Sequence, residues 1–175
     1  MRKIILVVAV LLFIYSVYSS NREKEKIRIP DSAIRFRILA NSNSPRDQKI
    51  KEDIRDKMQK ELYNLLKNTK NIDAARNVIN NNMNTFDDIL KSNMKNIEYS
   101  YKIDYGLHDF PEKKYKGIIY PSGKYESLLV TLGEGKGDNW WCVLFPPICL
   151  LEAEEQETNN VEYNFFIKDI LEKYF

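Results

Sequence analysis

Two cysteines and one histidine are the side chains best suited to nucleophilic chemistry in this chain of 175 residues. Cys142 and Cys149 stand seven positions apart around Pro146-Pro147. A catalytic thiolate needs a base beside it, but His108 is predicted to lie in a loop, and nothing in the sequence brings it near Cys142. Outside the cytoplasm, two cysteines at this spacing more simply form a disulfide. Two buried free thiols, or a thiol-dependent enzyme that uses Cys142, remain alternatives.

Acidic residues provide a second possible chemistry, because two carboxylates can hydrolyse a glycoside. The chain has 25 aspartates and glutamates, and neither spacing nor an apolar setting singles out a pair. Glu126 and Glu134 are the candidates, since both lie in the strand-rich half of the chain near aromatic residues. The alternative for each is an ordinary solvated residue, Glu126 on an exposed strand position and Glu134 in a loop.

The glycine-rich segment 133–137 does not match a nucleotide-binding loop. The P-loop pattern requires a glycine at position 130, which is Val130, and Ser or Thr at position 137, which is Gly137. The dinucleotide pattern fails at Asp138, where its third glycine should be. The segment therefore predicts a mobile hairpin loop or a loop that docks a partner. With two cysteines and one histidine there are too few ligands for a zinc site, and we expect neither a metal nor a cofactor.

Trp140 and Trp141 are adjacent on a predicted strand, so their side chains must point to opposite faces of a sheet. One indole can enter the core while the other lies on the outer face. Exposed Trp and Tyr suit stacking on carbohydrate or an interface with another protein. Burial of both rings beneath helices is the alternative.

The N-terminus has the three parts of an export signal: Arg2-Lys3, an apolar run over 4–14 and a small-residue exit ending at Ser19. We expect residues 1–19 to be a signal peptide or short anchor and 20–32 to be a tether. Without residues 1–19 the chain carries 25 basic and 25 acidic residues. A neutral chain gives no reason to expect nucleic acid as a partner. The expected location is extracytoplasmic, with at least transient membrane contact through the N-terminal segment.

Hydrophobic periodicity predicts the elements that position these residues. The firmest unit is a half-buried strand over 33–40, a polar exit at 41–43, and a helix that Ser44 caps and that runs to about Lys67. The remaining elements are helices over 72–79 and from Thr85 to about Met94, strands over 99–105, 116–120, 125–132 and 140–145, and an amphipathic C-terminal helix. This order predicts a single α+β domain over 33–175, with a mainly antiparallel sheet of about five strands packed against three to four helices.

Three stretches resemble one family, stage II sporulation protein R of endospore-forming bacteria. The first is YPSGKYESLLVTLGEGKGDNWWCVLFPPICLL over 120–151, and the second is RFRILANSNS over 35–44 followed by Asp47-Gln48. A weaker match covers Phe110 to Gly117. The string WWCVLFPP is long and compositionally rare, so chance explains the resemblance poorly.

The resemblance implies a signalling protein rather than an enzyme. Members of this family are exported from the forespore into the space between the two sporulation membranes. There they trigger a membrane-embedded aspartic protease of the mother cell, which cleaves the precursor of sigma-E. The family motifs and the glycine-rich loop together suggest a set of partner contacts: Lys136, Asn139, Trp140 or Trp141, Arg35 or Arg37, and the exit Asn41–Ser44. An exported module that binds or hydrolyses the cell wall remains the alternative.

Overall fold

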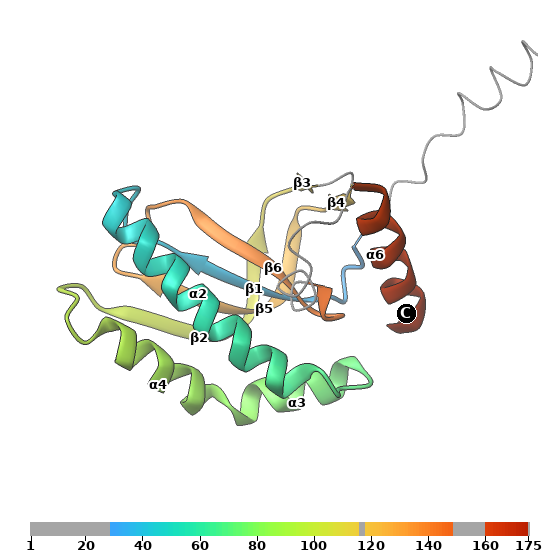
Figure 1. Cartoon of the computed structure of the whole chain (residues 1–175), viewed down its shortest axis with the longest axis horizontal. Helices are drawn as coiled ribbons and strands as arrows, with labels where there is room; N and C mark the ends of the chain where they lie inside the picture. The colour runs from blue at the N-terminus through green and yellow to red at the C-terminus, as the bar shows by residue number, and fades with distance from the viewer. Residues whose placement is uncertain (1–28, 116–117, 149–159, 175) are drawn as a thin grey trace, which may run out of the picture.

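The computed structural model describes residues 29–115, 118–148 and 160–174 (Figure 1). It contains an α+β fold, as predicted from the sequence. The elements follow in the order β1 (Ile34–Leu39), α2 (Pro45–Leu66), α3 (Ile72–Asn81), α4 (Met83–Met94), β2 (Tyr101–Phe110), β3 (Lys113–Tyr115), β4 (Ile118–Tyr120), β5 (Gly123–Leu132), β6 (Asn139–Phe145) and α6 (Asn160–Tyr174). Among these residues, no helix is long and apolar enough to cross a membrane.

The main sheet has four strands in the order β2-β5-β1-β6, and β3 pairs with β4 in a separate two-stranded sheet. β1 is parallel to β5 and antiparallel to β6, and β2 is antiparallel to β5. The main sheet is therefore mainly antiparallel, as expected, although the described residues form six strands rather than about five. β1, the first strand in sequence, lies between β5 and β6.

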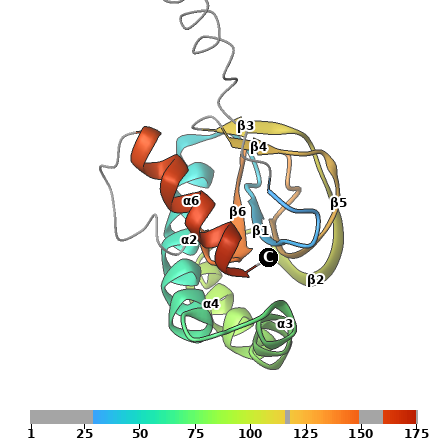
Figure 2. The ribbon, with the colours of Figure 1, turned by 90° about the vertical axis from the view of Figure 1, so that its right-hand side faces the viewer.

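Three helices, α2, α3 and α4, cover one face of the main sheet (Figure 2). Strand periodicity explains this layer, because alternate residues of β1 point to the same face. Ile34, Phe36 and Ile38 are fully buried under the helices. They join the buried apolar residues of α2, such as Ile54 and Met58, in one core cluster.

A smaller apolar cluster lies at the other end of the molecule, where α6 and the β3–β4 pair are found (Figure 1). It includes Ile118 of β4, Val143 of β6 and Ile167 of α6. Ile29, inside the predicted tether, is also fully buried there, and its N–H donates to the carbonyl of Ile119 at 3.2 Å. Folded structure therefore extends at least to residue 29, whereas the predicted signal over 1–19 lies outside the described residues.

The helix boundaries follow from local capping. Ser44 accepts a hydrogen bond from the backbone N–H of Asp47 at 3.1 Å, with Pro45 at the first helical position, as predicted. Asn71 caps α3 in the same way, accepting from the N–H of Ala74 at 2.8 Å. The helix is interrupted at Asn82, and α4 begins at Met83, two residues before the predicted start.

β2 is longer than predicted, because its pairing with β5 continues to Phe110 opposite Gly123. The predicted strand ends at Tyr105 because Gly106 follows it; Leu107 keeps the apolar alternation, and Asp109 ends it. Backbone hydrogen bonding to β5 does not depend on that pattern. The prediction that His108 lies in a loop is therefore wrong, because His108 is in β2 opposite Tyr125.

Candidate functional site

The glycine-rich loop after β5 is bound to the exit of β1. We call residues 40–43 and 133–138 together the glycine clasp. Asn41 accepts from the N–H of Glu134 through Oδ1 at 3.0 Å and from the N–H of Lys136 through its carbonyl at 3.3 Å. The N–H of Gly137 donates to the carbonyl of Ala40 at 2.9 Å. The loop is thus not the mobile hairpin expected from its glycines, because β5 and β6 are not partners and the loop crosses the end of β1.

The clasp requires glycine for two different reasons. Gly133 and Gly135 have φ values of +54° and +64°, in the left-handed region that glycine tolerates best. At Gly137 the cause is proximity: an added Cβ would lie 2.3 Å from the carbonyl oxygen of Ser42. Gly133 and Gly135 therefore allow the turn of the loop, and Gly137 allows its backbone to approach that of Ser42.

Asp47, in the first turn of α2, connects the glycine clasp to this helix through hydrogen bonds. Its carboxylate accepts hydrogen bonds from Ser42 Oγ at 2.6 Å, Asn41 Nδ2 at 2.8 Å and the Tyr99 hydroxyl at 2.9 Å. The bond from Ser42, followed by that from Asn41, holds the pKa of Asp47 below its usual value. The side-chain amide of Asn41, which the sequence suggests as a partner contact, thus donates to Asp47 and accepts from Glu134 within the protein.

Lys136 and Asn139, the other loop residues predicted to meet a partner, lie at the surface. Lys136 pairs with Glu134 at 2.6 Å, and both side chains are largely exposed. This exposed pair is not a glycosidase dyad, since Glu134 has a lysine rather than a second acid beside it. Asn139 is exposed at the start of β6.

The two tryptophans point to opposite faces, as strand geometry requires. Trp140 lies on the helix-covered face, where its ring centroid is 5.6 Å from that of Phe36 and the guanidinium of Arg55 lies over it. Trp141 lies on the other face, with ring contacts to Phe110 at 5.7 Å and Tyr120 at 5.1 Å. Both rings are half-buried. The two indoles therefore have different environments, and Trp141 belongs to the more polar one.

Three cations surround Trp141 and its aromatic neighbours; we call this group the cation–aromatic cluster. It consists of Arg35, Arg37, Phe110, Lys113, Tyr120, Tyr125 and Trp141. Arg35 is fully buried, with its guanidinium carbon 3.4 Å from the ring centroid of Tyr125 and 5.0 Å from that of Trp141. The Lys113 ammonium is 5.4 Å from the centroid of Trp141. Such cation–π contacts partly replace the water that burial removes.

Hydrogen bonding satisfies the two arginines only in part. Arg35 donates to the carbonyl of Pro121 at 3.4 Å, and Arg37 donates to the carbonyl of Asp109 at 3.1 Å. Arg35 Nε and Nη1 and Arg37 Nε are buried without a hydrogen-bond partner among the described residues. Burial lowers the pKa of both arginines. Unpartnered donors on buried guanidinium groups are uncommon and favour a nearby anion.

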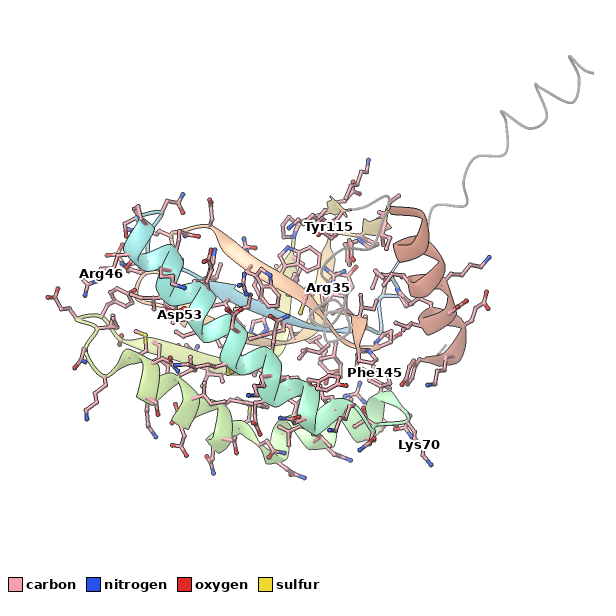
Figure 3. The ribbon with its side chains drawn as sticks, viewed as in Figure 1. Arg35, Arg46, Asp53, Lys70, Tyr115 and Phe145 are labelled. Carbon is pink, nitrogen blue, oxygen red and sulfur yellow. The ribbon has the colours of Figure 1, made fainter. Side chains whose placement is uncertain are left out.

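A cavity of about 260 Å³ opens beside this cluster. It is lined by Lys113, Tyr115, Tyr120, Trp140, Trp141, Cys142, Val143 and Ile148. Figure 3 shows Tyr115 on β3 and Arg35 on the main sheet. The walls are mainly aromatic and apolar, with one lysine, which suits an apolar group next to a negative charge.

Glu126, the other candidate acid, is held by partners on the helix side of β5. Arg76 of α3 donates to both carboxylate oxygens, at 2.7 and 2.8 Å, and the Tyr105 hydroxyl donates at 2.6 Å. The bonds from Arg76 lower the pKa of Glu126. The alternative of a simply solvated strand position is therefore wrong, and so is a general acid, which would need a raised pKa.

A serine, histidine and aspartate chain, missed in the sequence, lies on the opposite face of β2 and β5. His108 Nδ1 is 2.7 Å from Ser127 Oγ, and Nε2 is 2.9 Å from Asp104 Oδ2. A hydrolase needs an exposed serine supported by a buried acid. Here the order is reversed, because Ser127 is fully buried and the Asp104 side chain is 50% exposed. This series of hydrogen bonds links β2 to β5, but it offers no accessible nucleophile.

Cys142 is buried, 8% exposed, in the core cluster and the cavity wall. Cys149 lies outside the described residues, so the disulfide stays a prediction. The contacts of His108 go to Ser127 and Asp104, which gives no support to a cysteine–histidine pair. Among the described residues, no group of three potential ligands is placed to hold a metal ion.

The class of protein these features define is a compact α+β module with a built cation–aromatic surface. A family model described as stage II sporulation protein R matches residues 30–155. Stage II sporulation protein R of Bacillus subtilis (strain 168) is 40% identical over 162 residues, covering 86% of this chain and 72% of the relative. The chain therefore belongs to the stage II sporulation protein R family, which confirms the resemblance found in the sequence. No solved structure matches.

Proposed function

We propose that this protein is an exported sporulation signal that activates a membrane-embedded aspartic protease of the mother cell. Activation leads to cleavage of the sigma-E precursor. The observation that carries the proposal is family membership across residues 30–155. The N-terminal sequence, with the features of an export signal, supports an extracytoplasmic location between the forespore and mother-cell membranes.

The mechanism needs only binding. A ligand activates a protease when it binds the active arrangement more tightly than the inactive one. A hundredfold shift of that equilibrium requires about 2.7 kcal/mol of differential binding free energy. One well-packed aromatic anchor with a few charged contacts is sufficient for this. The hydrogen bonds around Asp47, Glu126 and His108 connect separate elements of the module, and a preordered surface loses less binding free energy in ordering.

A processing assay tests the proposal. The full chain is expressed with its own N-terminal segment, beside the candidate protease and the sigma-factor precursor, in a host that lacks all three. Precursor length is followed with and without the chain. We expect processing to depend on the chain and to persist in the variants His108→Ala and Glu134→Ala. Processing that is indifferent to the chain would refute the proposal.

The aromatic cavity beside Trp141 favours a second candidate, a cell-wall binding module, because sugars stack on exposed aromatic rings. Sedimentation of the protein with purified peptidoglycan separates the two candidates. The signalling proposal predicts that the protein stays in the supernatant. Sedimentation with peptidoglycan, together with precursor processing that is indifferent to the chain, would favour the cell-wall binding module.

A further inference from the structure

The cation–aromatic cluster carries more positive charge than the described residues neutralise. Arg35, Arg37 and Lys113 form no ion pair with a carboxylate anywhere in the ranges 29–115, 118–148 and 167–174. Asp31 is the one carboxylate among the described residues whose charge acts on Arg35. Arg35, with two unpartnered nitrogen atoms, is fully buried. A cluster of this kind is complementary to a negatively charged partner.

The cavity next to the cluster wraps the edge of a strand. Its wall includes Trp140, Trp141, Cys142 and Val143, which are consecutive in β6. Consecutive strand residues point to opposite faces, so a cavity that touches all four lies along the edge of the strand. β6 is the last strand of the four-stranded sheet. An extended segment can lie across the mouth of this cavity while one of its side chains enters it.

We infer that this cavity is the docking site for an extended acidic peptide segment with an apolar or aromatic anchor. The anchor fills the aromatic cavity, and an adjacent carboxylate meets Lys113 at the rim, with the charge of Arg35 behind Trp141. The inference rests on the proposed function, since it assigns the segment to the extracytoplasmic part of the protease. A neutral glycan would use the aromatic walls but leave the cations unpaired.

Two neighbouring lysines of β3 provide a matched test. Both lysines are exposed, but Lys113 lines the cavity, whereas Lys114 pairs with Glu112 at 3.8 Å. Lys113→Glu and Lys114→Glu make the same change in net charge on the same strand. In the processing assay we expect Lys113→Glu to lower the rate of precursor cleavage at least tenfold and Lys114→Glu to lower it less than twofold. Equal effects of the two variants would overturn the docking site.

Binding is measured separately with defined probes on the exported protein. The blocked pentapeptide EDFDE is titrated against tryptophan fluorescence beside KKFKK, inorganic phosphate and phosphatidylglycerol vesicles. We expect EDFDE alone to saturate, at millimolar concentration or below. Lys113→Glu should weaken it at least tenfold and added salt should weaken it further. No saturation by EDFDE, or equal binding of KKFKK, would overturn the inference. Lys113-dependent binding of phosphate or vesicles without EDFDE would also overturn it, in favour of a phosphate headgroup.

The two readouts keep the inference and the proposed function apart. If processing depends on the chain but is unaffected by Lys113→Glu, the docking site is wrong and the signalling role stands. If EDFDE binds through Lys113 but processing is indifferent to the chain, the site stands and the protease is the wrong partner.

Discussion

The glycine clasp makes a quantitative prediction at Gly137. In Gly137→Ala, the new Cβ would lie 2.3 Å from the carbonyl oxygen of Ser42 and 2.9 Å from the Cβ of Ala40. A backbone carbonyl cannot rotate away as a flexible side chain would, so the two segments must separate by about 1 Å to restore normal contact.

That separation strains two backbone hydrogen bonds, from Gly137 to Ala40 and from Lys136 to Asn41. Each is worth about 1 kcal/mol, and overpacking adds about 1–3 kcal/mol. The lower entropy of the unfolded alanine chain offsets about 0.5–1 kcal/mol. We expect a net loss of about 2–4 kcal/mol in the free energy of unfolding, which for a domain of this size lowers the Tm by about 6–12 °C.

Gly106→Ala is the matched control. A Cβ at Gly106 would meet only the Asp104 carboxylate, at 3.7 Å, which is an ordinary contact. A glycine in a strand interior is unfavourable in itself, so alanine should leave stability unchanged or raise it slightly. Both variants are compared by urea unfolding and thermal melts of the full chain. A loss at Gly137 no larger than at Gly106 would refute the reasoning from close approach.

Three further predictions concern the carboxylates of Asp47 and Glu126 and the expected disulfide. Asp47→Asn should cost about 2–3 kcal/mol at pH 7. Because the fold lowers the pKa of Asp47, its stabilising effect is present above the unfolded pKa of about 4 and is lost as pH falls through the folded value; denaturation from pH 7 to pH 2 should show the variant and the parent converging, and a constant difference would contradict this. Cys142→Ser and Cys149→Ser should each lose about 2–3 kcal/mol, and the double variant no more than either single one; thiol titration under denaturing conditions checks the disulfide, and two reactive thiols in the parent would exclude it. Glu126→Gln should lower the free energy of unfolding, measured in urea, by about 1 kcal/mol. Asp53→Asn, in an exposed pair with Lys49, is the control and should have a smaller effect. Equal losses in the two variants would show that the hydrogen bonds to Glu126 do not stabilise the fold.

Local features of the fold could be predicted because they depend on neighbours in sequence. The cap at Ser44, the apolar stripe of α2 and the alternation in β1 are each short-range patterns. The opposite directions of Trp140 and Trp141 follow from the same strand geometry. The end of β2 could not be predicted, because residues 106–110 form a strand only through pairing with β5.

The candidate site was only partly visible for the same reason. The sequence singles out Arg35 and Trp141, but Tyr125 and Phe110 join them only through the sheet order and register. The sequence suggests Asn41 as a partner contact, and only the structure shows that its side-chain amide also donates to Asp47 and accepts from the N–H of Glu134.

The sequence by itself determined the family, the α+β class, the helix caps and the glycine positions, because composition and short-range patterns carry that information. Only the tertiary structure decided that β1 lies between β5 and β6, and therefore that the glycine-rich loop crosses the end of β1. Only the tertiary structure brought Arg35, Lys113 and Trp141 around one cavity. The physical reason is that the place and register of β1 are fixed by hydrogen bonds and packing between residues 92–111 positions apart, which no local pattern specifies.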